Sequence, residues 1–257
     1  MNKLTHAELT LQELGIETPD EIDLEAIAFT LGARVRYRPL DGCEAHLIGN
    51  GENAIITVNS RSPPARRRFS LAHELGHWRY HRGRILVCRT EDIGRTDWVS
   101  TSPERVADGY AADLLMPWYL FSPMARQYPR LTFEIARKLA PAFDVSLEAA
   151  VIRLVDSKLF PSILVCHTPR GRKWFKRSPL VPERWFPRSE LDHESYAFDV
   201  LFGKTADDST PHKIGADAWF DRDEARYYEV QEQTVRVGDD RTLTLVTLIQ
   251  KRMLEDR

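Results

Sequence analysis

The chain has 257 residues, of which 42% are hydrophobic and 29% are charged, and its formal net charge is -2. This length suits two or three packed domains, and a charge so close to zero excludes attraction of nucleic acid to the surface as a whole. The three cysteines, Cys43, Cys88 and Cys166, are far apart in the sequence, which excludes a disulfide framework and a cysteine-rich metal site.

The first third of the chain predicts two helices followed by a small sheet. Apolar residues recur at helical spacing and then alternate as they do in strands. Gly32 is expected to end the second helix, and Ser62 is expected to cap the helix that follows the sheet, with proline in its first turn. The predicted elements are helices at 4–14 and 22–31 and strands at 34–38, 45–48 and 54–58, with a turn at 50–53.

The next helix carries the pattern His73-Glu74-Leu75-Gly76-His77. Two histidines four residues apart lie on one face of a helix, so both rings can bind one metal ion. Glu74 then lies beside the ion, where a carboxylate can take a proton from water during metal-assisted hydrolysis. The alternative is an exposed helix on which two histidines and a glutamate meet only solvent.

A catalytic metal needs a third protein ligand, and the helix predicted between Pro103 and Pro117 offers one. Glu104 and Asp108 share a face of that helix. Glu104 is the predicted third ligand, and Asp108 is predicted to accept the free ring N–H of a ligand histidine. The alternative is that both acids are solvated near a helix N-terminus, where negative charge is favourable. The polar stretch 83–102 before this helix is expected to be a loop that borders the cleft.

Other side chains near the two histidines have lesser predicted roles. His81 continues the four-residue spacing but lies a turn too far to share the ion, so we expect it to support the site or to pack. A third histidine ligand ten residues after the first is excluded, because that position is Gly83. Tyr80, His81 and Tyr110 are the candidates for stabilising an oxyanion, and the sequence does not rank them.

The middle and last parts of the chain predict a helical segment at 118–159 and strands with turns thereafter. Residues 133–154 suggest two helices joined by a short turn, with Ser146 as the cap of the second. Because Glu148 stands where a DNA-reading helix carries basic or amide groups, a structural hairpin is expected over a DNA reader. Hairpins are predicted at 162–177 and 228–249. The first of them mixes basic and aromatic residues, and we expect a solvated turn there rather than a nucleic-acid site.

Two stretches of the sequence resemble the ImmA/IrrE family of gluzincin-like metallopeptidases. They are residues 68–77, Arg-Phe-Ser-Leu-Ala-His-Glu-Leu-Gly-His, and residues 104–117, which begin at Glu104 and end at Met116-Pro117. The preceding segment, 16–59, shares the resemblance. The resemblance implies that His73, His77 and Glu104 bind the metal and that Glu74 is the base. The family more often has Asn where this chain has Asp108. The implied fold is α+β, with a zincin-like domain at 1–117, a helix-turn-helix-like segment at 118–159 and a C-terminal α+β domain at 160–257, GAF-like in one branch of the family.

The resemblance also implies a function. The expected protein is a regulatory endopeptidase that cuts a helix-turn-helix repressor and so relieves repression in a stress response or a mobile element. Zinc suits the predicted ligands, and manganese or iron would tolerate them. The alternative is a non-catalytic regulatory or antitoxin-like protein that binds a partner and retains the fold. With no N-terminal targeting segment and no apolar run of membrane-spanning length, a cytoplasmic protein without membrane contact is expected. Direct binding to DNA stays open as the less favoured alternative.

Overall fold

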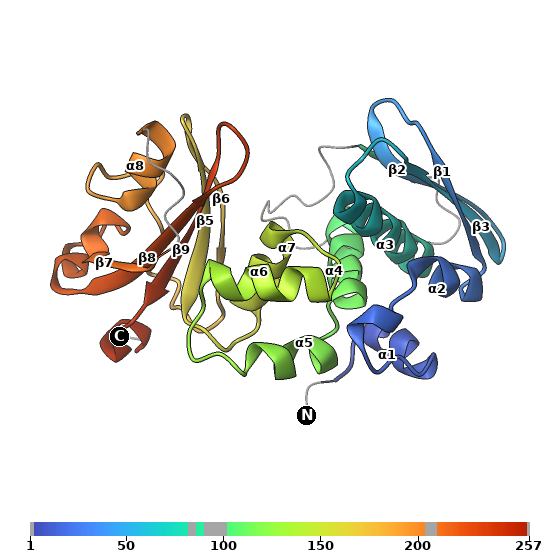
Figure 1. Cartoon of the computed structure of the whole chain (residues 1–257), viewed down its shortest axis with the longest axis horizontal. Coiled ribbons are helices and arrows are strands. Elements are labelled where there is room, and N and C mark those ends of the chain that lie inside the picture. The colour runs from blue at the N-terminus through green and yellow to red at the C-terminus, as the bar shows by residue number, and fades with distance from the viewer. Residues whose placement is uncertain (1–2, 82–85, 90–101, 204–209, 256–257) are drawn as a thin grey trace. The chain divides into compact units, whose positions relative to one another are not determined.

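The computed structural model describes residues 3–81, 86–89, 102–203 and 210–255, and it has helices and two β-sheets (Figure 1). The predicted α+β class is confirmed. The chain forms two compact units, one made of Met1–Met124 with Leu139–Ala149 and the other of Ala125–Lys138 with Ala150–Arg257. The predicted three-part division at 117 and 159 remains a prediction.

The first unit contains a four-stranded sheet of order β1-β3-β2-β4, in which β1 and β3 are parallel and the other neighbours are antiparallel. Its strands are β1 (Ala33–Arg38), β2 (Cys43–Asn50), β3 (Asn53–Asn59) and β4 (Leu86–Arg89). Side chains alternate across the sheet. Ala45, Leu47, Ile56 and Val58 are buried on the face that meets the helices, so this face forms the core of the unit.

In the described part of the chain, this sheet is accompanied by the helices α1 (His6–Glu13), α2 (Leu24–Thr30), α3 (Pro64–Tyr80) and α4 (Pro103–Leu115), with a short 3-10 helix at Pro19–Glu21. Gly32 follows α2 with φ of 82°, a left-handed conformation that suits glycine and ends the helix as predicted. Helix α3 packs against β2 and β3 on one side and against α4 on the other (Figure 1). Nine consecutive residues, from Ser70 to Trp78, are therefore buried.

Two local predictions were wrong. Pro63, not Ser62, is the N-cap of α3. The fixed φ angle of Pro64 suits the first helical position, and the Ser62 hydroxyl donates a hydrogen bond to Glu44 instead of capping the helix. The stretch 83–102 contains strand β4, which pairs with β2; its remaining residues up to 101, on which the predicted loop falls, lie outside the described residues. The buried stripe of α4 consists of Ala107, Tyr110, Ala111, Leu114 and Leu115.

The middle of the chain is helical, as predicted, with α5 (Trp118–Ala125), α6 (Phe133–Ala142) and α7 (Leu147–Asp156). The hydroxyl of Ser146 accepts a hydrogen bond of 3.1 Å from the Ala149 N–H, so the predicted cap of α7 is confirmed. Ala150, Val151 and Leu154 are fully buried. Both α6 and α7 contribute residues to each of the two units.

The second unit is built on a five-stranded sheet of order β6-β5-β9-β8-β7, which is antiparallel throughout. The two predicted hairpins are its pairs β5 (Ser162–Thr168) with β6 (Gly171–Arg177), and β8 (Glu229–Arg236) with β9 (Thr242–Leu248). Several further elements were not predicted: β7 (His212–Gly215), α8 (Tyr196–Phe202) and the short 3-10 helices at Ala216–Ala218, Asp223–Tyr227 and Lys251–Leu254. These elements cover a core that includes Trp185, Trp219 and Phe220.

The basic and aromatic residues of the first hairpin are mostly engaged within the protein. Lys176 pairs with Asp156 at 3.0 Å, and Arg177 pairs with Glu183 at 3.1 Å. Arg172 donates to the carbonyl groups of Pro187 and Arg188. These contacts favour the structural interpretation of the hairpin over a nucleic-acid site.

Candidate metal centre

The candidate site lies where α3 crosses α4 in the first unit. His73 and His77 project from one face of α3, and Glu104 lies in the first turn of α4. Ser102 caps α4 by accepting a hydrogen bond of 3.3 Å from the Arg105 N–H, which fixes where that first turn begins. The two histidines are fully buried, and the side chain of Glu104 is 29% exposed. The three side chains thus lie close together, with the two histidines shielded from solvent and Glu104 partly open to it.

The three ligand atoms have the spacing that one metal ion requires. His73 Nε2 lies 3.0 Å from His77 Nε2 and 3.1 Å from Glu104 Oε2, and His77 Nε2 lies 3.4 Å from the same oxygen. Bonds of about 2.0–2.1 Å to a tetrahedral zinc ion would place its ligand atoms about 3.3 Å apart. In the described part of the chain, these are the residues that form such a group of histidine, cysteine and carboxylate side chains. The donor set therefore fits a divalent cation.

The electrostatics of the site also favour a cation. Burial lowers the pKa of His73, but hydrogen bonds to Asp108 and Glu104 outweigh it and raise the pKa to about 9. Burial raises the pKa of Glu104, and its hydrogen bonds with His73 and His77 outweigh that effect and hold the pKa well below its ordinary value. The pocket thus stabilises positive charge between the two rings and an ionised carboxylate.

The second nitrogen of each histidine ring has a partner of its own. Asp108 Oδ1 lies 2.8 Å from His73 Nδ1, so the carboxylate accepts the ring N–H and leaves Nε2 as the ligand atom. His77 Nδ1 lies 3.2 Å from His81 Nδ1, and His77 can donate its N–H to that ring. The orientation of both rings is therefore fixed through Nδ1, the nitrogen that does not face the metal position. The partners are Asp108 on α4 and His81 at the end of α3.

Glu74 is fully buried on α3, next to His73. Its charge is among the effects that raise the pKa of His73. The pKa of Cys43 is raised by burial first and then by the Glu74 charge. The carboxylate therefore lies within electrostatic reach of the ligand set, on the side of β2.

Two of the candidates for an oxyanion partner, Tyr80 and Tyr110, contact each other and helix α1. The Tyr80 hydroxyl lies 2.8 Å from His6 Nδ1, and its ring meets that of Tyr110 edge to face, with 5.9 Å between centroids. Both tyrosines line a cavity of about 350 Å³ between α4 and the start of α1. Glu104 and Asp108 are not among the residues that line this cavity.

Gly76 is a residue of the site whose role the sequence analysis missed. A Cβ atom at this position would lie 2.8 Å from Ala107 Cα and 3.0 Å from the Ala107 carbonyl oxygen, too close to fit without movement of the backbone. Only glycine lets α3 approach α4 this closely, and this approach brings Glu104 to the histidines. A glycine inside a helix, where it is otherwise unfavourable, was the available signal.

Part of the chain is similar to known proteins. The family model of the IrrE N-terminal-like domain matches residues 28–155. The radiation response metalloprotease IrrE of Deinococcus radiodurans is 26% identical over 138 residues, which cover 54% of this chain and 41% of that protein. The protein of the same name from Deinococcus deserti is 31% identical over 123 residues, covering 46% and 42%. The chain thus spans about two fifths of the length of these relatives.

A solved structure, described as a Mycobacterium tuberculosis transcriptional regulator, has a similar fold. It aligns with a TM-score of 0.59 over 94% of this chain and 74% of that one, at 16% sequence identity. At this identity the likeness concerns the fold alone. No helix in the described part of the chain is long and apolar enough to cross a membrane.

Proposed function

The chain belongs to the ImmA/IrrE family through its IrrE N-terminal-like domain, and on this premise we propose that it is a metal-dependent regulatory endopeptidase. The observation that carries the proposal is the spacing of 3.0–3.4 Å among His73 Nε2, His77 Nε2 and Glu104 Oε2. Glu74, the next residue after His73 on the same helix, is fully buried and supports it. A structural metal site needs no buried carboxylate next to its ligands, whereas hydrolysis needs a base.

In this proposal His73, His77 and Glu104 hold a divalent cation, for which zinc is the first candidate and manganese or iron are alternatives. The ion would supply a Lewis acid that polarises the scissile carbonyl and acidifies water. Asp108 and His81 keep the two histidine rings in the tautomer that presents Nε2.

Glu74 takes a proton from the attacking water as the new C–O bond forms. It then returns the proton to the amide nitrogen as the C–N bond breaks, so the carboxylate is regenerated. We propose that the substrate is a helix-turn-helix transcriptional repressor, whose cleavage relieves repression in a stress response or a mobile element. The relatives named as metalloproteases of the radiation response support a regulatory role of this kind.

The test is incubation of the purified, zinc- or manganese-loaded protein with a helix-turn-helix repressor encoded beside its own gene. The parent should cut the repressor, as seen by mass spectrometry of the products. The Glu74→Gln variant should retain the metal and the fold but should not cut. Equal cleavage by both proteins would overturn the assignment of the base. Binding of the repressor by both, without cleavage by either, would favour the alternative of a non-catalytic partner-binding protein.

A further inference from the structure

Strand β1 forms one edge of the sheet in the first unit, and half of its main-chain groups point away from the sheet. The Gly32 and Arg38 carbonyls accept hydrogen bonds of 2.9 Å from Ala54 N–H and Ser60 N–H on the side of β3. Because main-chain groups alternate along a strand, the even-numbered residues face β3 and the odd-numbered residues Val35 and Tyr37 face the open side. In the described part of the chain, no strand pairs with β1 on that side. Such an edge can pair with an added strand.

The same strand carries three arginines at alternating positions. Arg34, Arg36 and Arg38 project from the sheet face opposite the core, and all three are exposed. None of them forms an ion pair with another described residue. Their partners in register on β3, which are Ile55, Thr57 and Asn59, carry no charge. The result is a row of three positive charges, spaced about 6.6 Å apart by the repeat of two residues along a strand.

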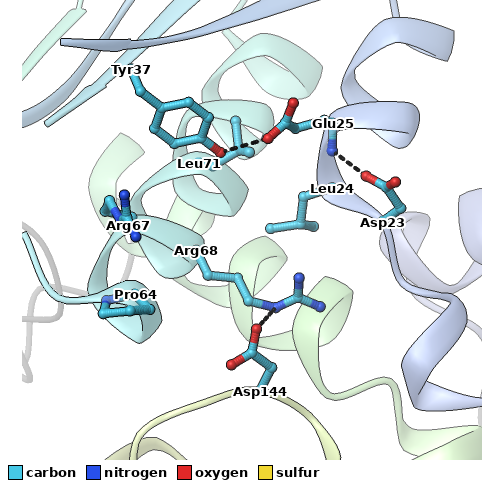
Figure 2. Close-up of a pocket in the computed structure, with 9 residues that line it drawn as sticks. All are labelled: Asp23, Leu24, Glu25, Tyr37, Pro64, Arg67, Arg68, Leu71 and Asp144. Carbon is cyan, nitrogen blue, oxygen red and sulfur yellow. Dashed lines mark hydrogen bonds and ion pairs between the residues drawn. The ribbon is translucent and has the colours of Figure 1, made fainter. Parts of the chain in front are cut away.

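On the core side, a pocket of about 360 Å³ opens beside Tyr37 (Figure 2). Arg67 lies with its guanidinium carbon 5.9 Å from the centre of the Tyr37 ring and has no carboxylate partner in the described part of the chain. The carboxylates of the pocket are already engaged: Asp23 caps α2, Glu25 accepts from the Tyr37 hydroxyl, and Asp144 pairs with Arg68. The lining consists of Asp23, Leu24, Glu25, Tyr37, Pro64, Arg67, Arg68, Leu71 and Asp144.

We propose that the open edge of β1 is a docking site for an extended acidic segment of a partner protein, which adds to the sheet as a further strand. Residues of that segment opposite Arg34, Arg36 and Arg38 project on the outer face, where acidic side chains meet the arginines. The intervening residues project on the inner face, toward the pocket beside Tyr37 and Arg67. The main chain provides the pairing, and the alternation of acidic residues provides the selectivity.

Charge alone would also suit nucleic acid, but two features favour a peptide. The main-chain groups at Val35 and Tyr37 offer the hydrogen-bonding pattern of a strand. The arginines also follow the two-residue repeat of that pattern, so one added strand satisfies both at once. Arginines on an edge strand can instead serve to prevent self-association, and this explanation predicts a different result in the experiment below.

The test measures binding of a fluorescent peptide of about eight residues, in which Glu alternates with Thr, to the full chain by fluorescence anisotropy. The triple variant Arg34→Gln, Arg36→Gln, Arg38→Gln should weaken binding about tenfold or more, and added salt should weaken binding to the parent. A matched triple variant of exposed residues elsewhere, Arg137→Gln, Arg170→Gln and Lys173→Gln, should bind like the parent. A peptide of the same composition with its Glu residues consecutive should bind more weakly than the alternating one.

Strand pairing is tested without changing the protein. Two further peptides carry N-methyl groups on every second residue, one on the odd and one on the even positions. A peptide that pairs with β1 donates from one of these two sets, so one peptide should lose binding and the other should retain it. Equal binding of both peptides would overturn strand addition.

Two other results would overturn the docking proposal. Tighter binding of a thymidine oligonucleotide, lost in the same Arg34, Arg36 and Arg38 variant, would make the surface a nucleic-acid site. Unchanged peptide binding by a triple variant that now self-associates would assign the arginines to protection of the edge. Because the assay needs neither metal nor Glu74, its failure would leave the peptidase proposal untouched.

Discussion

Gly76 on α3 faces Ala107 on α4 with no room for a side chain between them. A Cβ atom at Gly76 would lie 2.8 Å from Ala107 Cα. Since Glu104 lies one turn before Ala107 and His73 and His77 lie on either side of Gly76, this contact controls the distance between the carboxylate and the two rings. The glycine is thus a geometric requirement of the candidate metal centre.

Replacing Gly76 with alanine should therefore damage both stability and metal binding. The added methyl group forces the helices apart, which should cost about 1–3 kcal/mol of unfolding free energy. It should also draw Glu104 away from the histidines, so zinc retained after dialysis should fall. The control is Gly109→Ala on α4, where a Cβ meets nothing within 4 Å. That variant should be neutral or more stable by up to about 1 kcal/mol. Parent-like zinc content and melting temperature in Gly76→Ala would contradict this account.

Removal of the metal should lower the melting temperature of the parent protein, because an ion that binds only the folded state stabilises it. Zinc at a hundredfold excess over its dissociation constant should add about 2.7 kcal/mol to the free energy of unfolding. The His77→Ala variant should lose this shift, whereas Glu74→Gln should keep it, because Glu74 is assigned as base and not as ligand. A melting temperature of Glu74→Gln that no longer responds to zinc would instead make Glu74 a ligand. Differential scanning fluorimetry with and without a chelator measures these shifts.

Asp108 should contribute to metal affinity through His73. Its carboxylate lies 2.8 Å from His73 Nδ1, on the side of the ring away from the ligand atom. Loss of such a partner typically weakens metal binding about 10–100-fold, so Asp108→Ala should show this loss in competition with a zinc chelator. Asp108→Asn should lose less, because the amide oxygen still accepts the ring N–H. Exposed Glu13→Ala on α1 serves as the control. Equal affinity in Asp108→Ala and the parent would remove Asp108 from the site.

The sequence predicted the elements around the candidate site well, because each of them depends on local signals. Helical spacing placed His73 and His77 on one face, and Pro103 marked the start of the helix that carries Glu104. The hydrogen bond between Ser146 and Ala149 likewise follows from a capping preference. Such features need no knowledge of the rest of the fold.

The features that the sequence did not predict depend on contacts between distant segments. Strand β4 is four residues long and exists by pairing with β2, about forty residues earlier in the chain. Ser62 was expected to cap α3, but its hydroxyl donates a hydrogen bond to Glu44 on another element. The requirement for glycine at position 76 appears only when α4 is placed against α3. Periodicity and capping rules carry no information about such pairings.

His167 on β5 should make the second unit sensitive to acid. Its side chain is 1% exposed, and its ring meets that of Trp219 at 5.9 Å. Burial, and then the charge of Arg172, lower its pKa to about 4 from an ordinary value of 6.5. Between these two values the unfolded chain binds a proton that the folded protein does not, so stability is fully present above about pH 6.5 and falls as the pH drops toward 4.

The expected contribution of His167 over this range is roughly 3 kcal/mol, since each pKa unit corresponds to about 1.4 kcal/mol. The His167→Phe variant keeps an aromatic ring but cannot titrate, so its stability should fall less between pH 6.5 and 4.5 than that of the parent. Urea unfolding followed by tryptophan fluorescence measures the difference, with Trp219 as a nearby reporter. The control is His193→Phe, which makes the same substitution at a side chain that is 83% exposed. If the slope in His167→Phe equals that of the parent, the acid sensitivity arises from other groups and His167 is not its cause.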